Sequence, residues 1–467
     1  MKKVIFLLLD GARKDTVEKY LDLGYLPNLN EIINNGGSIS SATSVFPSTT
    51  GPAYTPFLMG LFPGNANLPG IRWFDKVNFS KNKLSLMAHR SYVGIEGLLL
   101  NDDIKKSNKT IFEIVKNSRS IFNEITRGLQ KEFDLTRISK GYYKIKSHFS
   151  GSSSIDLTSS KKLLSSLDKK VEFIFCCYLG VDSNSHIHGH DSKEVLDSYK
   201  SFDFELGKVI QKLKDNNELD DSLLIVTSDH GHSNTNSHIE LVDVLKKQGF
   251  KVFSYPLVFS KLIKDIDAAV MVSGNSMAHL YFRKEKDWSK RKTFNGSEKI
   301  IEDLVRNPGI DILIFINEKS QIIIRSIRGM AMLEDKESGL EYTPLVNDPF
   351  DYKNLKGLLT YEEILDKTFD TDYPDALTQI HQLFNSNRCG DLVISSNEGF
   401  DLRDNFEIPE HKSSHGSLKK EHMLVPLIMN KKVTEDKIRT VDLFPTILRF
   451  LNYKSPIKTD GKKLDIN

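Results

Sequence analysis

Five short segments of the chain each join a hydrophobic run to Asp, His or Thr residues, and together they span most of its length. They are VIFLLLDG (with Asp10), VFPSTTGP (Thr50), FIFCCYLGVDSNSHIHGH (Asp182, His186), LLIVTSDHGH (Asp229, His230) and SSHGSLKKEHMLVPLI (His415). In open α/β sheets, ligands bind in the crevice outside the carboxyl ends of the strands. A fold that gathers these strand ends would therefore bring several possible metal ligands to one edge of one sheet.

Length and composition limit the classes of protein to consider. The chain has 467 residues, of which 39% are hydrophobic and 27% charged, as expected for a globular protein with a large core and one inserted domain. The formal net charge of +2 gives no reason to expect a polyanionic partner, so we expect no nucleic-acid binding. No apolar run is long enough to cross a bilayer.

The start of the chain, MKKVIFLLLD, resembles a secretory signal because two lysines precede an apolar run. That run covers only residues 4–9, ends at Asp10 and is not followed by a small-residue cleavage site. We interpret it as the first buried strand and expect a cytoplasmic protein. Cys176, Cys177 and Cys389 lack the spacing of a metal site or a disulfide framework, which agrees with a reducing compartment.

Predicted strands and helices alternate over residues 1–264 and 389–467. This alternation favours an α/β fold with a mostly parallel central sheet and helices on both faces. The predicted strands are 4–9, 38–46, 171–179, 223–227, 392–395 and 424–429, and the predicted helices are 16–23, 28–34, 53–61, 195–213, 241–248 and 441–451.

Residues 265–388 have a different pattern, in which short strands surround one helix. The strands are predicted at 268–272, 278–282, 312–316 and 321–327, and the helix at 297–305. This pattern predicts a smaller α+β insertion that could cap a substrate site. The core would then consist of residues 1–264 and 389–467.

The segment 103–149 is basic, with eleven Lys or Arg against five Asp or Glu and with interleaved aromatic residues (Phe133, Tyr142, Tyr143 and Phe149). A solvated helical face is the simpler interpretation, and a surface for acidic lipid headgroups or another anionic substrate is the alternative. The sequence GSSS at 151–154 is typical of a linker.

The tetrapeptide Ser228-Asp229-His230-Gly231 is the strongest single indication of a metal site. Two adjacent ligands at a strand end can reach one ion if the chain turns, and Gly231 permits that turn. Asp10 alone could equally be the N-cap of the next helix.

Asp182 and His186 are four residues apart, so in a helix they would project from one face and could bind one ion. His188 and His190 could supply ligands in another register. His415 with Gly416 could complete the set, although a lone His-Gly pair is also common in ordinary loops.

Thr50 closes the run Ser48-Thr49-Thr50, which the pattern places near a helix N-terminus. Hydroxyls beside a proline often serve only as turn or cap residues, and Ser48 fits that role. A threonine becomes a useful nucleophile when a metal ion or an adjacent base lowers the pKa of its hydroxyl.

These motifs resemble those of the alkaline phosphatase superfamily, and within it the type I phosphodiesterase / nucleotide pyrophosphatase family. Phe46-Pro47 followed by Thr50, and then Gly60-Leu61-Phe62-Pro63, keep the spacing of that family's nucleophile loop. Asp182 with His186, Asp229-His230-Gly231 and His415-Gly416 match its metal motifs, and Cys389-Gly390-Asp391 echoes its return from the insertion.

The resemblance implies an alkaline-phosphatase-like core, Thr50 as nucleophile and two divalent metal ions, with zinc as the first choice and Mn or Mg as alternatives. One ion would be bound by Asp182, His186 and His415. The other would be bound by Asp10, Asp229 and His230, together with the oxygen of Thr50.

One position departs from the family. The family places an Asn three residues after the nucleophile, where this chain has Ala53. Another donor must then hold the phosphate oxygen, and backbone N–H groups of the loop, Arg72 and Asn101 are the candidates. A guanidinium such as that of Arg72 can bind phosphate at two points, although an ordinary salt bridge explains it as well.

We therefore expect a two-metal hydrolase of phosphate esters that acts through a phospho-threonine intermediate on a small nucleotide, sugar or lipid-headgroup ester. A phosphomonoesterase or phosphotransferase of the same superfamily is the alternative. Sulfatases and cofactor-independent phosphoglycerate mutases fit less well because their nucleophile is not Thr. From a different class, a non-catalytic metal-binding protein is a further alternative.

Overall fold

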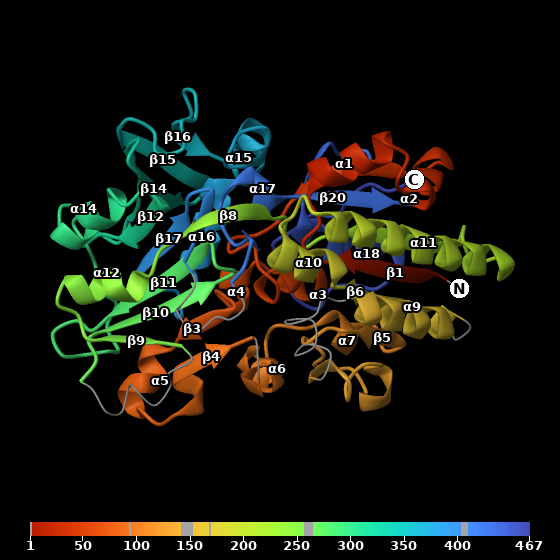
Figure 1. Ribbon diagram of the computed structural model, residues 1–467, viewed down its shortest axis with the longest axis horizontal. Coiled ribbons are helices and arrows are strands. Elements are labelled where there is room, and N and C mark those ends of the chain that lie inside the picture. Colours follow the sequence, from red (N-terminus) through yellow and green to blue (C-terminus); the bar gives the residue numbers. More distant parts are fainter. Residues whose placement is uncertain (1, 93–94, 142–152, 168–169, 256–264, 403–409) are drawn as a thin grey trace.

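The computed structural model describes residues 2–92, 95–141, 153–167, 170–255, 265–402 and 410–467. Two large sheets lie side by side along the long axis of the molecule (Figure 1). Within the described residues, no helix has the length and apolar composition that crossing a membrane requires.

The first sheet has seven strands in the order β21-β2-β20-β7-β1-β6-β5. Strand β1 pairs in parallel with both β7 and β6, and β5 and β21 also join their neighbours in parallel, whereas β20 is antiparallel to both of its neighbours. The strands are β1 Lys3–Leu9, β2 Ser38–Thr43, β5 Ser118–Ile121, β6 Phe173–Tyr178, β7 Ser222–Thr227, β20 Leu424–Met429 and β21 Lys437–Arg439. The predicted mostly parallel central sheet is confirmed.

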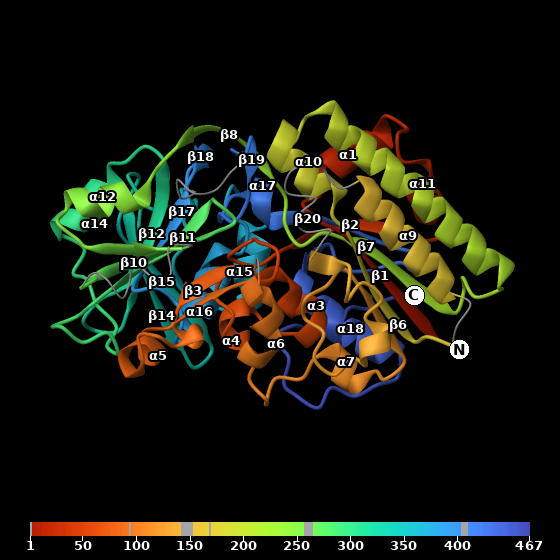
Figure 2. The same ribbon diagram turned by 60° about the horizontal axis from the view of Figure 1, so that its bottom comes forward.

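Helices cover both faces of this sheet, and its central strands are therefore buried on both sides. Figure 2 shows α9, α10 and α11 on one side and α3, α7 and α18 on the other. The helices of this half are α1 Lys14–Asp22, α2 Pro27–Asn34, α3 Thr55–Met59, α7 Ile111–Ile114, α9 Ser153–Leu167, α10 Gly180–His188, α11 Lys193–Asp215, α17 Lys420–Met423 and α18 Leu443–Phe450.

The second sheet has nine strands in the order β16-β15-β14-β13-β12-β17-β11-β10-β9 and is mainly antiparallel. The strands are β9 Val252–Ser254, β10 Ala268–Ser273, β11 Met277–Phe282, β12 Ile310–Ile316, β13 Ile322–Arg325, β14 Met330–Lys336, β15 Gly339–Val346, β16 Gly357–Leu359 and β17 Leu392–Ser396. β9 and β17 lie outside the predicted insertion 265–388, so this sheet also uses residues of the predicted core. The division of the chain into domains stays a prediction.

Three helices, rather than the single predicted one, accompany these strands between residues 265 and 388. They are α14 Lys299–Val305, α15 Tyr361–Thr368 and α16 Ala376–Phe384. The start of α15 is marked by a capping box, in which Thr360 and Glu363 bond each other's backbone N–H groups. α12 Leu241–Lys247 precedes this region. Three further short helices lie between α3 and α7 in the sequence, and they are α4 Pro63–Ala66, α5 Lys76–Lys81 and α6 Leu100–Asp103.

Two smaller sheets complete the fold. One joins β3 Arg72–Phe74 to β4 His89–Ser91, and the other contains β8 Ser233–His238, β18 Gly399–Asp401 and β19 Ser413–Ser414. β8 runs directly from the Asp229-His230 motif, and β19 directly precedes His415, so this small sheet brings the two motifs together.

The predicted linker at 151–154 is partly wrong, because Ser153 and Ser154 begin α9; residues 151 and 152 lie outside the described residues. In the basic segment, Tyr142, Tyr143 and Phe149 also lie outside them. Several of its cations make internal contacts: Arg119 lies over the ring of Phe133, and Lys140 pairs with Asp134 at 2.7 Å.

Candidate metal centre

The ends of three neighbouring parallel strands place most of the predicted ligands together. Asp10 follows β1, α10 with Asp182 and His186 follows β6, and Asp229 and His230 follow β7. Two backbone N–H groups link these strand ends. The Asp182 N–H donates to the Asp10 carbonyl at 3.1 Å, and the Gly11 N–H donates to Oδ1 of Asp229 at 3.4 Å. The expected crevice at the carboxyl ends of the strands is therefore where these side chains meet.

The loop with Thr50 connects β2 to a turn of 3-10 helix, Pro52–Tyr54, that leads into α3. It contains a cis Phe46–Pro47 peptide bond and Gly51 at φ 99°, a backbone conformation that favours glycine. Two glutamines of α16 hold its start: Gln379 accepts from the Phe46 N–H at 3.1 Å, and Gln382 donates to the Phe46 carbonyl at 2.7 Å. The loop is thus held by α16 as well as by its connection to β2.

The Thr50 hydroxyl lies between Asp10 and His230. Its Oγ1 is 3.3 and 3.4 Å from the two carboxylate oxygens of Asp10 and 3.1 Å from Nε2 of His230. Thr50 is partly exposed, whereas Asp10 and His230 are buried. A partly exposed hydroxyl held by a buried carboxylate and a buried imidazole is placed as a nucleophile would have to be.

Two groups of side chains could each bind an ion. Asp182, His186, His232 and His415 form the first group, and Asp10, Asp182 and His230 form the second; within each, the nearest ligand atoms lie within 4.8 Å of one another. In the first group, Oδ1 of Asp182 is 3.3 Å from Nε2 of His186 and 3.7 Å from Nε2 of His415. The first group thus contains the three ligands that the resemblance implies, and Asp182 is shared by both groups.

Asp229, which the resemblance implies as a ligand of the second ion, is not a member of the second group but lies beside its His230. Its Oδ2 is 3.4 Å from Nε2 of His230, and it is a buried oxygen that no donor reaches within the described part of the chain. A buried carboxylate oxygen without a donor is costly unless a cation faces it. The oxygen and imidazole donors of both groups are those that zinc binds, so the residues fit the ions that the resemblance implies.

Three of the histidines leave Nε2 for the centre, because their Nδ1 atoms face backbone carbonyls. Nδ1 of His186 faces the carbonyl of Ser413 at 2.8 Å, Nδ1 of His415 faces that of Ser48 at 3.1 Å, and Nδ1 of His230 faces that of Gly231 at 3.1 Å. A carbonyl only accepts, so each Nδ1 carries the proton and each Nε2 offers a lone pair. Such outer contacts are typical of metal-binding histidines.

Without a cation, the buried carboxylates of Asp10, Asp182 and Asp229 affect one another's ionisation. Burial, together with the carboxylates of Asp229 and Asp182, raises the pKa of the Asp10 carboxyl well above its usual range. Burial also raises the pKa of Asp229. Burial opposes ionisation of Asp182 as well, but without a cation the facing His186 and the hydrogen bond from His232 hold the pKa of Asp182 well below the usual range. A bound cation would favour the ionised form of all three.

His232 is the one member of these groups that the motifs did not indicate. It lies in the same segment, Asp229-His230-Gly231-His232. Its position two residues after His230 was the feature of the sequence that could have indicated it. His188 and His190, considered in an alternative register, are in neither group: His188 is exposed, and Nε2 of His190 contacts Arg13 at 3.0 Å.

The two candidate phosphate-binding residues are placed differently. The amide of Asn101 is engaged by backbone: its Oδ1 accepts from Thr126 and Arg127, both at 2.8 Å, and its Nδ2 donates to Glu124 at 2.9 Å. The guanidinium of Arg72 lies over the ring of Tyr255, 4.9 Å from its centroid. These contacts involve no side chain of the two groups.

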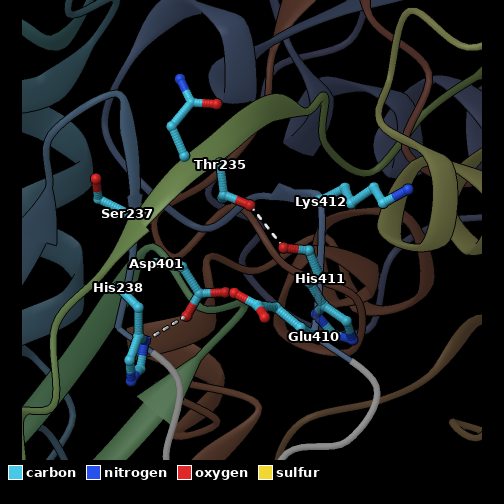
Figure 3. A pocket seen from close by; sticks show the side chains of 8 residues that line it. Thr235, Ser237, His238, Asp401, Glu410, His411 and Lys412 are labelled. Carbon is cyan, nitrogen blue, oxygen red and sulfur yellow. Dashed lines mark hydrogen bonds and ion pairs between the residues drawn. The ribbon is translucent and has the colours of Figure 1, made fainter.

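A hollow of about 180 Å³ lies beside His411 and Lys412, which contact His186 of the first group; Figure 3 shows the hollow. It is lined by Thr235, Asn236, Ser237, His238, Asp401, Glu410, His411 and Lys412. The ring of His411 packs on that of His186 with centroids 4.1 Å apart, and the Lys412 N–H donates to the His186 carbonyl at 2.8 Å. A substrate group could therefore occupy this hollow while it is close to the first group.

Comparison with solved structures shows the same fold over nearly the whole chain. An inactivated Thr-to-Ala variant of murine ectonucleotide pyrophosphatase / phosphodiesterase 5, in complex with AMP, has a TM-score of 0.57 at 17% identity, covering 99% of this chain and 98% of that one. The human protein of that name has a TM-score of 0.58 at 17% identity, with coverages of 99% and 97%.

Phosphonoacetate hydrolase from Sinorhizobium meliloti 1021, in complex with phosphonoformate, has a TM-score of 0.56 at 15% identity, with 96% of each chain covered. No curated protein matches the sequence significantly. The family model described as type I phosphodiesterase / nucleotide pyrophosphatase matches residues 4–418, which include all the predicted ligands and Thr50. The chain therefore belongs to the type I phosphodiesterase / nucleotide pyrophosphatase family, in the alkaline phosphatase superfamily.

Proposed function

We propose that this protein is a two-ion hydrolase of phosphate esters in which Thr50 is the nucleophile. The observation that carries the proposal is the position of the Thr50 hydroxyl, 3.1 Å from Nε2 of His230 and 3.3 Å from Asp10. Family membership and the two groups of carboxylates and imidazoles support it. We propose zinc for both ions, with Mn or Mg as alternatives.

Bound ions would lower the pKa of the threonine hydroxyl and stabilise negative charge on the phosphoryl oxygens. The remaining work falls to the chain itself. Asp10 accepts from the Thr50 hydroxyl and so directs the oxygen lone pairs toward the open side of the site. Attack on phosphorus breaks the Thr50 O–H bond, forms the Thr50 Oγ–P bond and breaks the bond to the leaving oxygen, which takes up a proton and departs as an alcohol. Water then cleaves the phospho-threonine, which releases the phosphate product and restores the Thr50 hydroxyl.

The substrate that we propose is a small phosphate ester of a nucleotide, sugar or lipid headgroup. The hollow beside His411 would take part of such a molecule, and the carboxylates of Asp401 and Glu410 in its wall would favour a hydroxyl-bearing leaving group over a second phosphate. The chain has Ala53 where the family has Asn, so the donor that usually holds a phosphate oxygen is missing at that position.

A parallel turnover screen tests the proposal. The purified protein with added zinc or manganese would be given bis-p-nitrophenyl phosphate, p-nitrophenyl phosphate, nucleotide diesters, phospholipid headgroup esters and phosphonoacetate. We expect turnover of at least one phosphate ester, and the ratio of diester to monoester rates would identify the substrate class. An absence of turnover in all arms, with two ions bound, would favour the non-catalytic metal-binding alternative.

A further inference from the structure

His232 is a buried histidine that the proposed chemistry does not use. Its Nε2 is 2.8 Å from Oδ1 of Asp182, and its Nδ1 is 2.9 Å from the hydroxyl of Ser413. Its ring lies close to those of His186 and His415, with centroids 4.9 and 5.0 Å away. It could act as a fourth ligand of the first ion or as a donor that positions Asp182.

The distances separate these two roles. Two ligands of one tetrahedral zinc ion, each about 2.0–2.1 Å from it, lie roughly 3.3 Å apart. The 3.3 Å between His186 Nε2 and Asp182 Oδ1 matches this separation. The 2.8 Å between His232 Nε2 and the same oxygen is shorter and matches a hydrogen bond to a carboxylate.

The partner of Nδ1 also distinguishes His232. His186, His230 and His415 each have Nδ1 against a backbone carbonyl, which forces the proton onto Nδ1. Nδ1 of His232 instead faces the hydroxyl of Ser413, which can donate. The carboxylate of Asp182 only accepts, so at 2.8 Å Nε2 of His232 carries the ring proton and donates it. Nδ1 then has a lone pair, and the single proton of the Ser413 hydroxyl goes to it rather than to the Ser233 carbonyl, which lies 3.0 Å from the same hydroxyl.

Packing holds the ring in this position. A Cβ placed on Gly11 would lie only 2.8 Å from the His232 ring, so the ring fills the space beside the turn that follows Asp10. The ring is also fully buried. His232 therefore has little freedom to move away from Asp182.

We propose that His232 is a positioning residue, which donates a hydrogen bond to Asp182 and fixes the carboxylate that both ion groups share. This inference rests on the proposed two-ion function. It assigns the relay from Ser413 through His232 to Asp182, and it predicts that the first ion keeps an open coordination position because His232 does not fill it.

The test compares His232→Ala, His232→Gln and Ser413→Ala with the wild-type protein, using His188→Gln as the control for an exposed histidine on α10. The glutamine amide can donate near the position of Nε2 but is a poor zinc ligand. Zinc affinity and stoichiometry would be measured by calorimetry, the coordination of Co²⁺ by its visible absorption, and folding by the melting temperature of the metal-free proteins.

We expect His232→Ala and Ser413→Ala to bind two zinc ions but to lose roughly 10–100-fold in affinity for one of them, as is typical for outer-shell partners. His232→Gln should recover most of that loss, with an unchanged Co²⁺ spectrum, and His188→Gln should match the wild type. If His232→Ala does not fold, His232→Gln and Ser413→Ala decide the question by the same criteria.

Three results would overturn the inference. Loss of affinity in His232→Gln as large as in His232→Ala, with an altered Co²⁺ spectrum, would make His232 a ligand. Unchanged zinc affinity in every folded variant would make it a purely structural residue. A wild-type protein that binds no zinc, manganese or cobalt would refute the proposed two-ion function itself, and the inference with it.

Discussion

The imidazole rings of His230 and His415, one from each ion group, stack with centroids 3.7 Å apart and planes 9° apart. They are 185 residues apart in the sequence, one after β7 and one after β19. Their Nδ1 atoms are bonded to backbone carbonyls, so both Nε2 atoms are available to ions. The stack therefore places the two candidate ion groups side by side, with Asp182 common to both and Thr50 beside one of them.

Replacement of the proposed nucleophile should separate catalysis from metal binding. We expect Thr50→Ala to lower turnover by at least about 10³-fold, because the acceptor of the phosphoryl group is gone. Both ions should still bind, since their carboxylate and imidazole ligands remain. Steady-state turnover and calorimetric zinc stoichiometry check this, with Thr49→Val as the matched control because Thr49 is the adjacent, fully buried threonine. Full activity in Thr50→Ala would contradict the assignment.

Loss of Asp229 should remove an ion as well as activity. Its buried Oδ2 lacks a donor among the described residues and faces His230. We expect Asp229→Ala, and the isosteric Asp229→Asn, to bind one zinc ion instead of two and to lose turnover. Asp203→Asn changes another buried carboxylate, which accepts from the Asn28 and Leu29 N–H groups, and should keep both ions. Two ions retained in Asp229→Asn would show that this carboxylate is not a ligand.

Removal of metal should destabilise the fold. Three buried carboxylates meet at the centre, and two of them have pKa values raised by burial, so their mutual repulsion opposes folding when no cation is present. Zinc at 100 times its dissociation constant should add about 2.7 kcal/mol of stability per site. Thermal unfolding with a chelator and after zinc is added back measures this, and a melting temperature indifferent to both treatments would contradict it.

Strand ends and local spacing allowed much of the centre to be predicted. Asp10, Asp182 and Asp229 follow buried apolar strands, and parallel neighbours must end at the same edge, so their meeting required only local patterns. Thr50 and His415 came from short motifs, and the structure brings both to that edge.

Contacts between segments far apart in the sequence could not be predicted from local sequence patterns. Gln379 and Gln382 hold the Phe46 backbone across more than 300 residues, and α16 itself was missed. His232 was passed over because a histidine two residues beyond a ligand has no fixed direction until β8 pairs with β19. Asn101 was considered because Ala53 replaces the family's Asn, yet its amide is used up by three backbone contacts with Glu124, Thr126 and Arg127.

The buried carboxyl group of Asp156, at the start of α10, should make the free energy of unfolding depend on pH. Asp156 accepts from the Leu179 and Gly180 N–H groups at the start of that helix, and burial raises its pKa to about 7. In the unfolded chain it ionises near pH 4. Its contribution is therefore complete below about pH 4 and is lost as the pH rises through about 7, by at most about 4 kcal/mol.

Asp156→Asn removes this titration while it keeps the size of the side chain. The difference in unfolding free energy between the wild type and this variant, measured by urea denaturation from pH 4 to pH 8, should shift against the wild type as the pH rises. A difference that is constant over this range, or that shifts in favour of the wild type, would show that Asp156 stays ionised in the folded protein.

The positions of the ions test the proposed centre most directly. Anomalous diffraction at the zinc edge, from crystals grown with zinc, should show two peaks about 3.5–4 Å apart. One should lie among Asp182, His186 and His415, and the other among Asp10, Asp229 and His230, within reach of the Thr50 hydroxyl. A single peak, or peaks away from Thr50, would contradict a two-ion mechanism with a threonine nucleophile.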